Sequence, residues 1–126
     1  MIQPPWIEIT TALPCPVGCY YCPQAVLQRA YQGERVLTLD RFEAVLRNVP
    51  ATVIVDFAGF SEPFGNPQCV DMVLLAHRLG YRLAMNTTLT GATDEDLGRL
   101  AEIPWEFFFY ICMAIHISPS YNLAFP

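Results

Sequence analysis

Three cysteines lie close together near the start of the chain, at Cys15, Cys19 and Cys22. Prolines before, between and after them exclude a regular helix, and Gly18 can adopt the left-handed backbone that a tight turn requires. The segment therefore predicts a loop that turns its thiols inward. Three thiolates so close in sequence can bind one metal centre, and they leave a fourth position open.

The type of centre follows from what the rest of the chain lacks. A structural zinc site usually takes four ligands from two paired motifs, but the other cysteines and histidines are scattered singly, at Cys69, His77, Cys112 and His116. The odd number of five cysteines and the absence of a secretory leader after Met1 argue against a disulfide framework. An iron–sulfur cluster with one open iron fits better, and zinc remains the alternative.

The cysteine spacing, with aromatic Tyr21 just before Cys22, resembles the cluster loop of the radical S-adenosylmethionine (radical SAM) enzymes. In that family the loop follows the first barrel strand, and residues 6–11 are predicted to form a strand here. The resemblance implies a [4Fe-4S] cluster held by Cys15, Cys19 and Cys22, with S-adenosylmethionine on the fourth iron. It also implies reductive cleavage to a 5'-deoxyadenosyl radical, hydrogen abstraction from an unknown peptide or small molecule, and an electron donor such as flavodoxin or ferredoxin.

A second segment, residues 57–67, resembles the Gly-Gly-Glu-Pro motif that follows the second strand in this family. Phe60 and Ser61 stand where the glycines usually lie, and Gly59-x-Ser61-Glu62-Pro followed by Asn-Pro is a variant associated with the same family. The resemblance implies that Gly59 and Ser61 belong to the cofactor site and that Glu62 accepts a hydrogen bond from the methionine amino group. A surface glutamate in a turn is the alternative for Glu62.

A third segment, residues 85–91, resembles the Thr-Asn-Gly turn of the family and places Asn86 at the adenosyl pocket. Ordinary turn chemistry explains this segment equally well, because Asn and Thr side chains satisfy nearby backbone groups. Asp56 is the one charge inside a predicted buried strand. Both an inward position near the cofactor and a structural hydrogen bond are open for it.

Strand-like and helix-like stretches alternate, which predicts an α/β fold. We expect a partial (βα) barrel of the radical SAM type, with about three βα units and a fourth parallel strand. The predicted strands are residues 6–11, 52–57, 81–85 and 105–111, and the predicted helices are residues 23–31, 39–48, 70–79 and 94–102. Capping residues are Thr38, Asn66 with Pro67, and Thr93. The three motifs then follow successive strands and meet at one rim.

Composition restricts the partners. The net charge of −5 argues against broad nucleic-acid binding. Residues 107–115 are too short an apolar run to span a membrane. We expect a soluble cytoplasmic protein, since a reducing compartment keeps thiols available for a cluster.

Residues 1–106 are predicted to be the N-terminal part of a radical SAM core, whose usual form has six βα units. Residues 107–126 carry no charged side chain. We expect truncation or a shifted reading frame there, with a naturally short chain completed by a partner as the alternative. Two functions remain open at this point: a radical enzyme or its N-terminal half, and a non-catalytic iron–sulfur or zinc-binding fragment.

Overall fold

The fold is built on one parallel β-sheet. The computed structural model describes residues 5–111, so the predictions for Cys112, His116 and the end of the tail lie outside the described residues. Four strands pair in the order of the sequence: β1 (Trp6–Ile9), β2 (Ile54–Phe57), β3 (Arg82–Thr87) and β4 (Phe107–Tyr110). All three pairings are parallel. The predicted α/β class is confirmed, and across residues 5–111 the sheet is open, with β1 and β4 at its edges.

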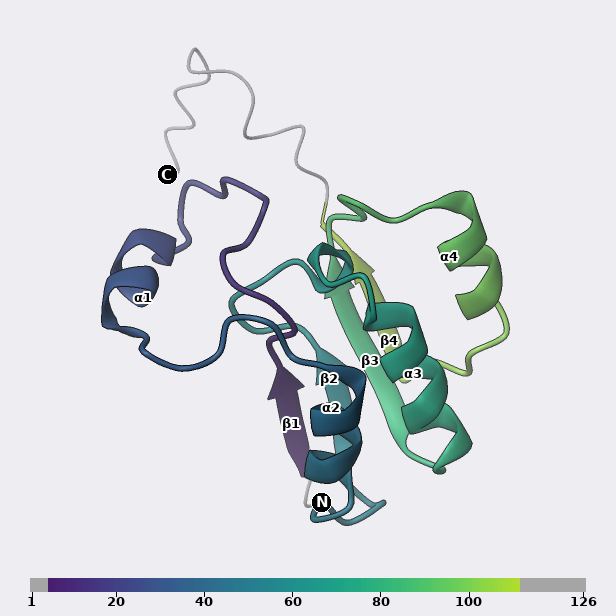
Figure 1. The fold of residues 1–126 in the computed structure, drawn as a ribbon. Coiled ribbons are helices and arrows are strands. Elements are labelled where there is room, and N and C mark those ends of the chain that lie inside the picture. Colours follow the sequence, from purple (N-terminus) through teal and green to yellow (C-terminus); the bar gives the residue numbers. More distant parts are fainter. Residues whose placement is uncertain (1–4, 112–126) are drawn as a thin grey trace, which may run out of the picture.

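Helices connect the strands and cover one face of the sheet (Figure 1). They are α1 (Gln24–Ala30), α2 (Leu39–Leu46), the 3-10 helix η1 (Pro63–Gly65), α3 (Cys69–Arg78) and α4 (Asp94–Leu100). In the covering layer α3 packs against both α2 and α4, whereas α1 lies apart, near the carboxyl end of β1. In this part of the chain no helix has the length and apolar character needed to cross a membrane.

Two helices begin at the predicted capping residues. The Thr38 hydroxyl accepts a hydrogen bond from the Arg41 N–H (3.4 Å) before α2. Thr93 and Asp96 form a reciprocal capping box at the start of α4, which satisfies backbone donors that have no partner within the helix. Phe42 and Leu46 are the buried residues of α2, whereas Val45 is exposed.

Asn66 does not cap α3, contrary to prediction. The helix begins three residues later, and its N-cap residue Gln68 makes no capping bond with its side chain. The Asn66 amide donates instead to the carbonyls of Thr11 (2.7 Å) and Leu37 (2.8 Å), and its oxygen accepts from the Gln68 N–H (2.9 Å). Because Asn66 is only 1% exposed, this side chain satisfies groups that are shielded from water. It thereby ties the segment after β1 to the segment after β2.

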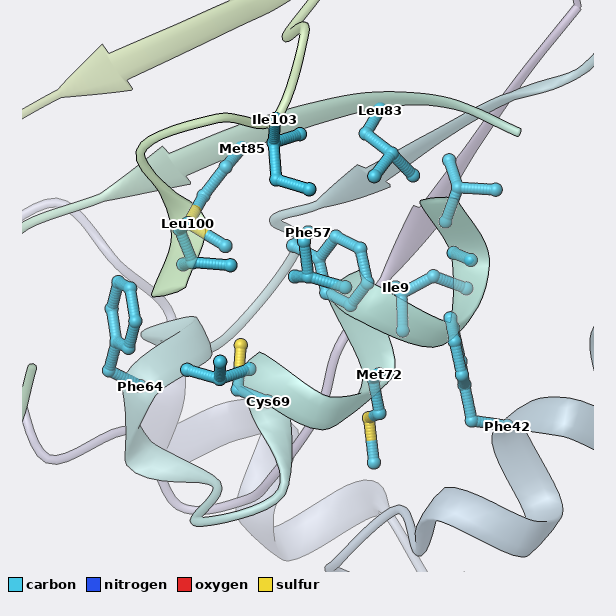
Figure 2. Packing of buried hydrophobic residues seen from close by; sticks show 14 of the residues in the cluster. Ile9, Phe42, Phe57, Phe64, Cys69, Met72, Leu83, Met85, Leu100 and Ile103 are labelled. Atoms are coloured by element: carbon cyan, nitrogen blue, oxygen red, sulfur yellow. The ribbon is translucent and has the colours of Figure 1, made fainter. Parts of the chain in front are cut away.

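The hydrophobic core lies between the sheet and the helix layer (Figure 2). Alternate strand residues enter it, among them Ile9 of β1, Phe57 of β2 and Met85 of β3. Phe42 of α2 packs against Phe57 with ring centroids 5.7 Å apart, and Met72 of α3 is fully buried in the same cluster. This packing fixes which residues of each strand face the helices, so the carboxyl ends of the strands are held at one edge.

The opposite face of the sheet is called the inner face below. Side chains alternate along a strand, so Glu8 of β1 and Asp56 of β2, which are register partners, both point to this face. Trp6 of β1 stacks on Phe107 of β4 with ring centroids 4.8 Å apart. In a flat sheet these two edge strands would be about 14 Å apart. The two rings therefore reach across β2 and β3 and cover the beginning of the inner face.

We predict that Asn66→Ala lowers the free energy of unfolding by about 2 to 3 kcal/mol, because it leaves buried carbonyls without their donor. Urea denaturation followed by circular dichroism measures the change. Asn48→Ala is the matched control, since the exposed Asn48 amide donates only to the Ala44 carbonyl (2.9 Å); its effect should stay within about 0.5 kcal/mol. Equal stability of the two variants would show that the Asn66 bonds do not hold the segments together.

Candidate functional site

One cavity brings together all the residues predicted for the site. It has a volume of about 380 Å³ and lies at the carboxyl ends of β1, β2 and β3. Its lining includes Cys15, Cys19, Tyr21, Cys22, Gly59, Ser61, Glu62 and Asn86. The predicted convergence of three segments at one rim is therefore seen in the structure. Asn86 differs in one respect, because it lies within β3 and not in the turn that follows it.

The cysteine loop, residues 13–23, is anchored at its base. The Leu13 N–H donates to the Arg35 carbonyl (2.7 Å), and the Leu37 N–H donates to the Thr11 carbonyl (2.9 Å). These bonds form a short antiparallel bridge that closes the excursion containing the loop and α1. The bridge therefore fixes the beginning of the cysteine loop against the segment that precedes α2.

Two sulfur atoms in the loop accept hydrogen bonds from amide groups. The Glu62 backbone N–H donates to Cys15 Sγ (3.2 Å), and Gln24 Nε2 donates to Cys22 Sγ (3.4 Å). The Cys22 N–H donates to the Cys19 carbonyl (3.2 Å), which makes the tight turn between these two cysteines. Donors aimed at sulfur stabilise the thiolate, the form that binds metals.

The three thiols are close enough to influence one another's charge. Burial raises the pKa of Cys19, and the neighbouring Cys15 and Cys22 thiolates raise it further. A hydrogen bond with Tyr21 acts in the opposite direction. Negative charge on Cys15 or Cys22 therefore disfavours the Cys19 thiolate, and a bound cation would oppose that effect.

The donor set of the loop consists of three thiols that line one cavity. Across residues 5–111, no three His, Cys, Asp or Glu side chains are placed to hold one metal ion. A cubane cluster makes a different demand, because each thiolate binds a different iron and the three sulfurs surround the cluster without meeting at a point. The three thiols that line the cavity would have to provide this arrangement, and Cys15 and Cys22 accept amide hydrogen bonds in it.

The loop after β2 depends on Gly59. Its φ of +80° favours glycine, and an added Cβ would collide with the Thr10 hydroxyl. That hydroxyl accepts a hydrogen bond from the Phe60 N–H (3.1 Å), and the Thr11 hydroxyl donates to the Pro63 carbonyl (3.1 Å). The close approach that Gly59 permits lets the segments after β1 and β2 bond side by side.

Glu62 joins the loop after β2 to the end of β3. One carboxylate oxygen accepts from the Thr87 hydroxyl and the Phe64 N–H, and the other accepts from the N–H and the hydroxyl of Thr88 (both 2.7 Å). Only 4% of the residue is exposed. The alternative of a surface glutamate in a turn is therefore wrong. The four donors match the acceptor capacity of an ionised carboxylate, so a ligand ammonium would have to share or replace one of them.

Asp56 and Asn86 form a polar pair on the inner face, below the cavity. Asn86 Nδ2 lies 3.2 and 3.4 Å from the two Asp56 carboxylate oxygens, and Asp56 is 1% exposed. Burial raises the pKa of Asp56 to about 6, and the negative charge of Glu8 adds to this shift. The hydrogen bond from Asn86 opposes it. Asp56 is therefore hydrogen-bonded and faces inward, whereas its nearness to a cofactor stays a prediction.

Two residues kept out of the predicted site lie elsewhere. Cys69 is buried at the start of α3, where burial and the nearby Glu62 charge raise its pKa to about 12, so it remains a protonated core thiol. His77 is exposed on α3.

The prediction missed Glu8 and Gln24. Glu8 lines the cavity, and Gln24 bonds to Cys22. The alternation of residues 6–9 could have identified Glu8 as inward-facing, whereas no sequence pattern marks Gln24.

The chain has a distant match among known proteins. The tungsten-containing aldehyde ferredoxin oxidoreductase cofactor-modifying protein of Pyrococcus furiosus is 29% identical over 108 residues. The match covers 83% of this chain and 29% of that protein, so the chain spans less than a third of its relative's length. No family model and no solved structure matches the chain. The comparison thus establishes distant similarity to a cofactor-modifying protein.

We predict that Asp56→Asn flattens the pH dependence of stability between about pH 4 and 6. Because the folded-state pKa of Asp56 is raised, protonated Asp56 favours folding, and this stabilisation is lost as the pH rises through about 6. The loss amounts to at most about 3 kcal/mol. Urea denaturation from pH 4 to 7.5 should show the variant gaining stability relative to wild type as the pH rises. Asp40→Asn, at an exposed site on α2, is the control. Parallel pH profiles for wild type and Asp56→Asn would contradict the prediction.

Proposed function

We propose that this chain provides the cofactor-binding part of a radical SAM protein. Cys15, Cys19 and Cys22 would hold a [4Fe-4S] cluster, and S-adenosylmethionine would occupy the adjoining cavity. The observation that carries the proposal is the shared cavity, in which the three thiols and Glu62 come from separate segments of the chain. The resemblance of two motifs to the family supports it, as does the similarity to a cofactor-modifying protein.

The chain's own residues have separate tasks in this proposal. When bound, the cluster supplies the electron that cleaves S-adenosylmethionine to a 5'-deoxyadenosyl radical. Glu62 places a buried negative charge where it would attract the methionine ammonium, and Thr87 and Thr88 hold that carboxylate in place. Asn86 is held by Asp56 on the cavity floor, where its amide would contact the adenosyl group. The proposal also includes an unknown substrate, an electron donor such as flavodoxin or ferredoxin, and a cytoplasmic location.

The second candidate function is a non-catalytic metal-binding module. It draws support from the sheet, which across residues 5–111 has four strands and does not close into a barrel. The two candidates differ in the metal taken up, because zinc favours a closed set of four ligands whereas the cluster retains an open iron.

We predict that anaerobic reconstitution with iron and sulfide gives a reducible [4Fe-4S] cluster in the wild-type chain. Cys15→Ala, Cys19→Ala and Cys22→Ala should each abolish it, because each removes one iron ligand. Iron analysis, absorption spectra and electron paramagnetic resonance measure the outcome. Cys69→Ala and Cys112→Ala are the controls and should retain the cluster. Full iron loading of Cys19→Ala, or selective tetrahedral zinc binding by wild type, would refute the assignment.

We predict that Glu62→Gln keeps the iron content of the reconstituted protein but weakens S-adenosylmethionine binding by about 10- to 100-fold. The change removes the charge that pairs with the ammonium, and hydrogen bonds to charged groups contribute about 1.5 to 3 kcal/mol. Isothermal titration calorimetry measures the affinity. Glu102→Gln, at an exposed site after α4, is the matched control. Equal affinities for wild type and Glu62→Gln would exclude this role of Glu62.

A further inference from the structure

A single amide side chain connects three points of the site. Gln24, the first residue of α1, accepts a hydrogen bond from the Cys15 N–H through Oε1 (3.4 Å). Its Nε2 donates to Cys22 Sγ (3.4 Å) and to the Phe60 carbonyl. These groups belong to the beginning of the cysteine loop, the end of that loop and the loop after β2. Gln24 therefore spans the cysteine loop from inside and attaches it to its neighbour.

The chemistry of the partners fixes the orientation of this amide. The Cys15 N–H can only donate and the Phe60 carbonyl can only accept, so the oxygen must face Cys15 and the nitrogen must face Phe60. In that orientation the second N–H of the amide points to Cys22 Sγ. The hydrogen bonds of Gln24 with the Cys15 N–H and the Phe60 carbonyl thus direct its amide nitrogen toward the Cys22 sulfur.

We propose that Gln24 is a positioning residue of the cysteine loop, and that its N–H···S bond tunes the centre held by Cys22. The proposal rests on the proposed function for the identity of that centre. An amide donor to a cysteine sulfur withdraws negative charge from the ligand and makes the centre easier to reduce. The Cys15 and Phe60 bonds keep the donor aimed, because they fix both ends of the amide.

The positioning role can be tested in the protein without iron. Gln24→Leu removes all three hydrogen bonds at similar side-chain size. We expect exchange of the Cys15 backbone amide, measured by nuclear magnetic resonance, to become about fivefold to tenfold faster, because this N–H loses its acceptor. Gln32→Leu is the matched control, since the exposed Gln32 amide donates only to the Arg29 carbonyl. Unchanged exchange at Cys15 in Gln24→Leu would overturn the proposal.

The tuning role is tested on the reconstituted protein by redox titration monitored by electron paramagnetic resonance. We expect Gln24→Leu to bind iron like wild type and to have a more negative midpoint potential. Gln24→Glu should shift the potential further, because it exchanges the donors for a negative charge beside Cys22. Gln32→Leu should match wild type. A Gln24→Leu potential equal to that of wild type would overturn the proposal even with faster exchange, since Gln24 would then be merely structural.

The two proposals fail in different ways. A wild-type chain that forms no [4Fe-4S] cluster would refute the proposed function, and the exchange measurement would still decide whether Gln24 holds the loop. A wild-type chain that forms the cluster, with Gln24→Leu unchanged in exchange or in potential, would refute only the assignment of Gln24.

Discussion

The candidate site depends on Glu62 more than on any other residue, because it interacts with both neighbouring loops. Its backbone N–H donates to Cys15 Sγ, and its carboxylate accepts from the Thr87 and Thr88 hydroxyls and from the Thr88 N–H. Parallel strands align their carboxyl ends, but their loops share no ladder of backbone bonds beyond the sheet. A buried carboxylate with four donors supplies that link, and its charge is stabilised by them.

The polar groups of the inner face lower the stability of the fold, whereas the hydrophobic core on the other face raises it. Asp56 accepts side-chain hydrogen bonds from Asn86 and Trp6, but a second carboxylate, Glu8, lies beside it in register. Burial therefore raises the pKa of Asp56 to about 6. A packed hydrophobic residue would stabilise this position better. Polar residues that reduce stability are typical of binding and catalytic sites, and this pair lies directly below the cavity proposed for the cofactor.

Much of the fold could be predicted from the sequence because its signals are local. Alternation of strands and helices predicted the parallel sheet, and Thr38 and Thr93 began their helices as expected. Asn66 shows where local rules fail. Its sequence neighbourhood is that of a helix cap, but buried carbonyls of Thr11 and Leu37 take its amide. Those partners lie 55 and 29 residues away, and no local pattern reveals them.

In the candidate site, too, the sequence predicts the residues that carry a local signal and misses those that bond to distant segments. Cysteine spacing marks the thiols because the chemistry requires those residues, whereas Gln24 is one of many amides that could have held the loop. Both Asn66 and Gln24 act by bonding backbone groups of segments far apart in sequence. The loops therefore owe their arrangement to a few amide and carboxylate side chains. Because none of these side chains belongs to the hydrophobic core, a substitution at one of them acts first on the arrangement of the loops.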